Sequence, residues 1–187
     1  MRTIRQAKKK KETVVFLDPT HQVHNTVNGY CWQIKGKQGT KNIFSNSGRK
    51  RITIIGALNA VTHQPTTLIT ESNCDKEAMK CFLEELRKDY PGFKRISVFL
   101  DNARYSHNKE VVAHAKTLNI KLIFLPPYSP NLNLIERLWK FFKKKIKNNI
   151  YHKTFTDFKN AVTDFFKNIQ HYKTELSSLL TLKFEII

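Results

Sequence analysis

The chain has 187 residues, of which 40% are hydrophobic, so it can fold around a core and is not expected to be disordered. Lysine and arginine total 33 against 15 acidic residues, and the formal net charge of +18 favours a polyanionic partner, nucleic acid above all. No apolar run is long enough for a transmembrane helix, and the lysine-rich N-terminus lacks the apolar segment of a secretory signal, which argues against a membrane protein.

The first half of the chain is predicted to consist mainly of strands. Residues 1–12 form a basic arm. Short runs rich in β-branched and aromatic residues predict strands over 14–17, 30–34, 51–58 and 67–70. The first strand is expected to end in a turn at Asp18-Pro19, because proline removes a backbone donor and fixes φ.

In the second half, strands alternate with helices. Helical spacing of apolar residues predicts a helix over 75–89, with Asn73 as its N-cap, and a short helix over 109–118. Strands are predicted over 96–100 and 121–125. Two amphipathic helices follow the proline-rich loop at 126–130, the second over 156–169. This order predicts an α/β fold with a mixed sheet flanked by helices.

Three acidic residues lie at the ends of predicted elements. Asp18 closes the first strand, Asp101 closes the strand over 96–100, and Glu136 lies in the first turn of the helix after the proline loop. If the two strands are neighbours, the aspartates meet at one edge of the sheet and the helix can bring Glu136 to them. Three oxygen donors favour Mg²⁺ or Mn²⁺ over zinc, and two such ions can cleave a phosphodiester.

Each acid also has a purely structural explanation. Asp18 and Asp101 are plausible turn residues. Asn133 could cap the late helix, which would make Glu136 its partner in a capping box. His21 and His24 have the spacing of zinc ligands but lack further soft ligands nearby. Trp32 and Trp139 are interpreted as core anchors rather than base-stacking platforms.

Two motifs, 34 residues apart, resemble those of DDE transposases of the insertion-sequence-630 and mariner superfamily. Asp101-Asn102-Ala103-Arg104-Tyr105 with His107 is similar to the second-aspartate motif of that family, and the segment from Leu125 to Trp139 is similar to its third-acid motif. Phe16-Leu17-Asp18 resembles the first-aspartate region. The sequence departs from the family at Pro19, where an acid is frequent, and at Leu134, where proline is usual.

The resemblance implies a ribonuclease H-like catalytic domain over 13–150, with three antiparallel strands followed by parallel strands, and a C-terminal helical extension over 151–187. It also implies that Asp18, Asp101 and Glu136 bind two Mg²⁺ or Mn²⁺ ions for cleavage at transposon ends and attack of the freed 3′-hydroxyl on target DNA. The residues expected to contact DNA are Asn102, Arg104, Tyr128, Lys140, Lys143, Lys144 and Lys147. Asn102 could instead orient Asp101 or simply form a turn. His107 could lie near the scissile phosphate or be an ordinary loop histidine.

The remaining expectations concern partners and competing functions. The resemblance implies a homodimer in the bacterial cytoplasm, associated with the nucleoid. Too few residues precede the first strand for a helix-turn-helix, so either such a segment comes from another, upstream reading frame or the chain is a truncated copy. The competing functions are a ribonuclease H-like nuclease and a DNA-binding remnant that has lost catalysis.

Overall fold

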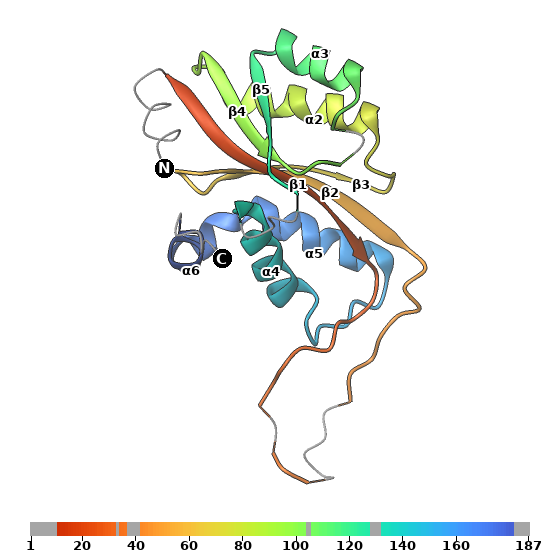
Figure 1. Ribbon diagram of the computed structural model, residues 1–187. Coiled ribbons are helices and arrows are strands. Elements are labelled where there is room, and N and C mark those ends of the chain that lie inside the picture. The colour runs from red at the N-terminus through yellow and green to blue at the C-terminus, as the bar shows by residue number, and fades with distance from the viewer. Residues whose placement is uncertain (1–10, 33, 37–41, 104–105, 128–131, 182–187) are drawn as a thin grey trace.

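The computed structural model describes residues 11–32, 34–36, 42–103, 106–127 and 132–181. Its centre is a mixed five-stranded sheet with helices on both faces (Figure 1). The strands, in the spatial order β3-β2-β1-β4-β5, are β3 (Pro65–Thr70), β2 (Arg51–Asn59), β1 (Glu12–Val23), β4 (Arg95–Leu100) and β5 (Ile120–Phe124). The first three strands of the chain are antiparallel, and β4 and β5 run parallel to β1. This topology confirms the predicted fold.

Five α-helices and one 3₁₀ helix cover the two faces of the sheet within the described residues. On one face lie α2 (Lys76–Asp89) and α3 (Lys109–Thr117), and on the other lie α4 (Ile135–Ile146), α5 (Phe155–Lys167), the 3₁₀ helix η3 (Ile169–Tyr172) and α6 (Lys173–Leu179) (Figure 1). The N-cap of α2 is Asp75, whose side chain accepts from the Ala78 amide, and not Asn73 as predicted.

The alternation of side chains along the strands divides the interior into two apolar clusters. Even-numbered residues of β1, such as Val14 and Phe16, belong to the cluster under α4, α5 and α6. Odd-numbered residues, such as Val15 and Leu17, belong to the cluster under α2 and α3. The predicted C-terminal extension therefore packs its apolar side chains on the same face of the sheet as α4.

The first strand is longer than predicted. It does not end at Asp18-Pro19 but continues to Val23, paired with β2 throughout. Proline is accepted where a strand has no neighbour on one side. Among the described residues, β4 pairs with β1 only as far as Phe16, so Pro19 lies where β1 has become an edge on that side. Asp18 therefore lies inside β1, with strand residues before it and after it in the chain.

The predicted strand over 30–34 is absent among its described residues. Tyr30 and Trp32 are fully exposed, so Trp32 is not a core anchor. The described parts of the segment between β1 and β2 project away from the sheet (Figure 1). The base of this segment is anchored by Asn149, whose side chain exchanges two hydrogen bonds of 2.9 and 3.1 Å with the backbone of Gly29.

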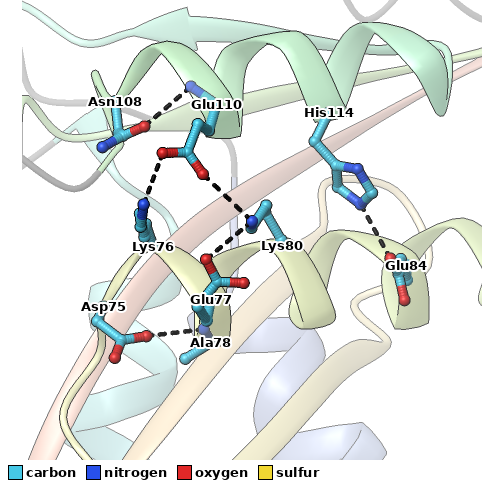
Figure 2. A network of polar contacts seen from close by, with 9 residues as sticks. All are labelled: Asp75, Lys76, Glu77, Ala78, Lys80, Glu84, Asn108, Glu110 and His114. Carbon is cyan, nitrogen blue, oxygen red and sulfur yellow. Dashed lines mark hydrogen bonds and ion pairs between the residues drawn. The ribbon is translucent and has the colours of Figure 1, made fainter.

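Surface ion pairs join α2 to α3 on the outer side of the molecule (Figure 2). Glu110 of α3 contacts Lys76 at 2.6 Å and Lys80 at 3.5 Å, and His114 contacts Glu84 at 3.0 Å. All these side chains remain partly exposed. No helix among the described residues is long and apolar enough to cross a bilayer.

Candidate active site

The strand register brings the two aspartates to corresponding positions. Phe16 of β1 pairs with Phe99 of β4, and their rings stack with centroids 5.5 Å apart. Asp18 and Asp101 each follow two residues later, so both continue the run of side chains that faces α4. Asp18 is largely buried, whereas Asp101 lies just past the end of β4 and is exposed.

Glu136 reaches the same end of the sheet because α4 is packed tightly against it. The helix buries Ile135, Leu138, Trp139 and Phe142 on its sheet-facing side, while Glu136 in its first turn remains partly exposed. Repulsion from Glu136 contributes to the raised pKa of Asp18, and repulsion from Asp101 contributes to the raised pKa of Glu136. The three carboxylates are therefore close enough to interact electrostatically.

Burial dominates the electrostatics of the first acid. Desolvation raises the pKa of Asp18 from 3.8 to about 7; a hydrogen bond from Trp139 and the charge of Lys143 oppose that rise, and the charges of Asp101 and Glu136 add to it. For Glu136, partial burial again raises the pKa, while Lys140 and Lys143 lower it. Without metal, burial thus favours the protonated form of Asp18, whereas a bound cation would favour the ionised form.

Trp139 has a second role besides packing. It is buried, as predicted for a core anchor, but its indole Nε1–H also donates to Oδ2 of Asp18 at 2.9 Å. Sequence reasoning missed this contact. The available signal was Gly56, a glycine inside a strand of β-branched residues, which indicates close approach of another group.

The capping-box explanation of Glu136 is wrong. The N-cap of α4 is Leu134, which provides no side-chain hydrogen bond to the helix. Asn133 is buried, and its Nδ2 donates instead to the backbone carbonyl of Leu17 at 3.3 Å, next to Asp18. Glu136 is consequently not part of a capping box, the structural role that was the alternative to metal binding.

Asn102 connects the end of β4 to the end of β5. Its Nδ2 donates to the Leu125 carbonyl at 2.6 Å, and its Oδ1 lies 3.1 Å from Nε2 of His107. The His107 ring stacks on Phe124 with centroids 3.9 Å apart. Both polar ends of the Asn102 amide are engaged within the protein, which favours a role in the turn itself, orienting Asp101 or simply forming the turn, over direct contact with DNA.

The basic residues of α4 differ in their surroundings. Lys140, Lys143 and Lys144 are exposed. Lys147, predicted to contact DNA, is only 5% exposed and donates to the Val23 carbonyl at 2.8 Å and to Asn25 Oδ1 at 3.1 Å. That prediction is corrected, because its ammonium group holds the end of β1. Arg104 and Tyr128 lie outside the described residues.

The described residues contain no group of three or more His, Cys, Asp or Glu side chains close enough together to hold a metal ion. The histidines suggested as zinc ligands have other partners: His21 contacts Thr53, and His24 contacts the His152 carbonyl at 2.9 Å. Asp18, Asp101 and Glu136 are nevertheless the right donors for a hard cation, since all six oxygens are carboxylate oxygens. Ion binding would have to draw the three acids closer together.

A family model for DDE superfamily endonucleases matches residues 13–159, most of the chain and all three acids. The chain belongs to this family. Among relatives of this DDE chain, the insertion element IS630 uncharacterized 39 kDa protein of Shigella sonnei is 24% identical over 168 residues, 89% of this chain and 46% of that protein. The chain spans about half the length of that relative.

Solved structures of the Mos1 mariner transposase have the same fold. The paired-end complex with Mn superposes with a TM-score of 0.67 at 16% identity, over 96% of this chain and 56% of that chain. The catalytic domain of Mos1 alone gives a TM-score of 0.60 at 14% identity, over 96% of this chain and 83% of that chain. At these identities the similarity establishes the ribonuclease H-like transposase fold, which the DDE family membership had implied.

Proposed function

We propose that the chain is the catalytic domain of a transposase, which cuts DNA at transposon ends and joins the freed 3′-hydroxyl to target DNA with Mg²⁺ or Mn²⁺. What supports this proposal is that Asp18, Asp101 and Glu136 lie toward the same end of the sheet and influence one another electrostatically, in a member of the DDE endonuclease family. Two bound ions would activate the attacking oxygen and stabilise the leaving oxygen of the phosphodiester.

The residues of the chain supply the geometry and the charge. Asp18 is fixed by β1 and Trp139, and Glu136 is fixed by the packing of α4. Asn102 holds the turn that carries Asp101 against the end of β5, so we assign it and His107 to positioning. The exposed Lys140, Lys143 and Lys144 follow Glu136 on α4 and would bind backbone phosphates on either side of the scissile bond.

Binding to DNA through phosphates should depend steeply on salt and little on sequence. A further segment, such as the predicted helix-turn-helix, would read the transposon ends. The unmatched half of the insertion-element relative leaves room for one. We also propose a homodimer, because two transposon ends must be brought together. The exposed Tyr30, Trp32 and Phe44 between β1 and β2 offer an apolar surface for a second copy.

The direct test is strand transfer by the purified protein. The substrate is DNA that carries the terminal repeats flanking the gene, with supercoiled plasmid as target and Mn²⁺ as the ion. We expect joined products from the parent chain and none from Asp101→Asn. The matched control is Asp164→Asn, an exposed aspartate of α5 that does not influence the pKa of Asp18 or of Glu136, and it should keep full activity.

The competing functions give different results in the same assay. Hydrolysis of RNA–DNA hybrids without strand transfer would replace the transposase with a ribonuclease H-like nuclease. Salt-dependent DNA binding without any cleavage, in Mg²⁺ or in Mn²⁺, would identify a remnant that has lost catalysis. A dimer is checked by sedimentation at several protein concentrations, where Trp32→Ser should shift the equilibrium toward monomer.

A further inference from the structure

A single indole ring fills the space beside the first acid. Asp18 and Gly56 are direct register partners in the antiparallel pair of β1 and β2, so their side-chain positions lie next to each other on the face toward α4. Gly56 has no side chain to occupy its position. The ring of Trp139 lies there instead, with its N–H on Oδ2 of Asp18 at 2.9 Å.

The fit of this ring depends on the glycine. A Cβ atom at position 56 would lie 2.6 Å from Cη2 and 2.9 Å from Cζ2 of Trp139, which is closer than real Cβ contacts allow. The ring cannot move away freely, because Trp139 is buried and packs edge-on against Phe166 with centroids 6.2 Å apart. Gly56 is therefore the residue that permits Trp139 to reach Asp18.

We propose that Trp139 is a positioning residue for the metal site, holding one oxygen of Asp18 so that the other oxygen is presented to the cation. This inference rests on the proposed function. An indole is suited to the task, because it donates one hydrogen bond, accepts none and carries no charge that would compete with the ion. Carboxylate ligands of metals are commonly held in place by such a hydrogen bond from a neighbouring residue.

The same helical turn serves two acids. Trp139 follows Glu136 by three residues, so the two side chains lie on adjacent parts of the α4 surface. One turn thus carries the third acid itself and the donor that fixes the first. Any displacement of α4 would move both carboxylate positions together, which makes the packing of Trp139 over Gly56 a determinant of the whole site.

The test measures Mn²⁺ affinity by calorimetry, separately from DNA cleavage. Trp139→Phe keeps an aromatic ring but removes the donor, and we expect Mn²⁺ affinity to fall by about tenfold or more. Phe165→Leu is the matched control, since it alters the same apolar cluster away from Asp18 and should leave Mn²⁺ affinity unchanged while lowering the unfolding temperature. The rate constant for cleavage should fall in Trp139→Phe even at saturating DNA.

The second arm uses the glycine. Gly56→Ala should reduce Mn²⁺ affinity about as much as Trp139→Phe does, because its methyl group displaces the indole. In the double variant, Gly56→Ala should add little, since phenylalanine lacks the outer ring atoms that the methyl would strike. The indole N–H resonance of Trp139, assigned by its loss in Trp139→Phe, should shift in metal-free Asp18→Asn.

The outcomes separate the inference from the proposed function. If the parent binds Mn²⁺ and Asp101→Asn does not, the metal site exists. Unchanged affinity in Trp139→Phe, or additive losses in the double variant, would then show that Trp139 only packs and would overturn the inference alone. A parent chain that binds no Mn²⁺ would overturn the proposed function and this inference with it.

Discussion

The two faces of the sheet are stabilised in different ways. Under α2 and α3 the large side chains, such as Phe82 and Leu86, are fully buried and apolar, and the charged groups of these helices pair at the surface (Figure 2). Under α4 lie the partly buried carboxylate of Asp18 and the buried side chains of Asn133 and Lys147. Desolvating such groups costs free energy unless each has a partner.

This difference in buried groups indicates that the face under α2 and α3 mainly stabilises the fold, whereas the face under α4 also supports the candidate site. Trp139, Asn133 and Lys147 each donate a hydrogen bond to β1. The acceptors are the Asp18 side chain and the carbonyls of Leu17 and Val23, all beyond Phe16, where the pairing of β1 with β4 ends. The face of α2 and α3 also has a buried polar contact with β1, the 3.0 Å hydrogen bond from Asn59 to Thr13, but no charged side chain is buried there among the described residues, and it serves as the support. Five substitutions test this division, two on the side of α2 and α3 and three on the side of α4.

The largest loss of stability is expected on the supporting face. Phe82→Ala removes a fully buried ring and should lower the free energy of unfolding by about 3–5 kcal/mol, through lost burial and the cavity that remains. Urea unfolding measures this loss. The Mn²⁺ affinity of the folded protein should not change; a weakened affinity would show that the two faces are coupled.

Asp18→Asn should stabilise the metal-free protein at alkaline pH. Because the folded-state pKa of Asp18 is raised to about 7, its contribution to stability is complete below about pH 4 and is lost as the pH rises through 7. Asparagine carries no charge at any pH, so at pH 8 in EDTA the variant should be more stable by on the order of 3 kcal/mol. Urea unfolding of both proteins at pH 5 and pH 8 measures the difference.

With Mn²⁺ present, the order should reverse, since only the parent gains stability from the ion. The same unfolding series in Mn²⁺ is thus the control for the role of Asp18. Equal pH dependence of the parent and Asp18→Asn would contradict the burial of a titrating carboxylate on this face.

Lys147→Met should distinguish buried from exposed lysines on α4. The variant loses the hydrogen bond to the Val23 carbonyl, partly offset by removal of a buried charge, so the free energy of unfolding should fall by about 1 kcal/mol. DNA affinity, measured by fluorescence anisotropy, should match the parent. In Lys143→Met it should fall, and the salt dependence should become less steep. Equal losses in both variants would restore Lys147 to the DNA-contacting set.

The smallest effect is expected at the ion pairs of Figure 2. Glu110→Gln breaks the contacts of Glu110 with Lys76 and Lys80, but these groups are exposed and screened by salt. We expect the unfolding temperature to change by no more than about 2 °C at physiological salt, by scanning calorimetry. A larger change in the unfolding temperature would mean that the ion pairs between α2 and α3 contribute substantially to the stability of this face, beside its apolar core.

Much of the architecture followed from local patterns. Apolar spacing located α2, α4 and α5, and β-branched runs located β2 and β4, because these elements bury one face or both. The run at 30–34 misled for the same reason: aromatic residues predict a buried strand, but Tyr30 and Trp32 are exposed on a segment that projects from the sheet. Local composition does not reveal whether a sheet is there to receive a strand.

Spacing and neighbouring motifs predict Asp18, Asp101 and Glu136 as the acids of the site, but they do not predict the groups that contact those acids. The hydrogen bonds of Trp139 and Asn133 join residues more than 100 positions apart, and only the packing of α4 on β1 creates them. Asn133 had an adequate local explanation as a helix cap, and Lys147 looked like its exposed neighbours because helical spacing alone does not locate the end of β1.

Both ends of the proline-rich segment are fastened to the neighbours of the two aspartates. Asn102, next to Asp101, holds the carbonyl of Leu125, and the carbonyl of Leu17, next to Asp18, holds Asn133. The entropy of closing such a loop grows only slowly with its length. Residues inserted between these two hydrogen bonds should therefore disturb the position of Glu136 little. The length of the segment that precedes α4 can then change during evolution while the distances among the three acids are kept.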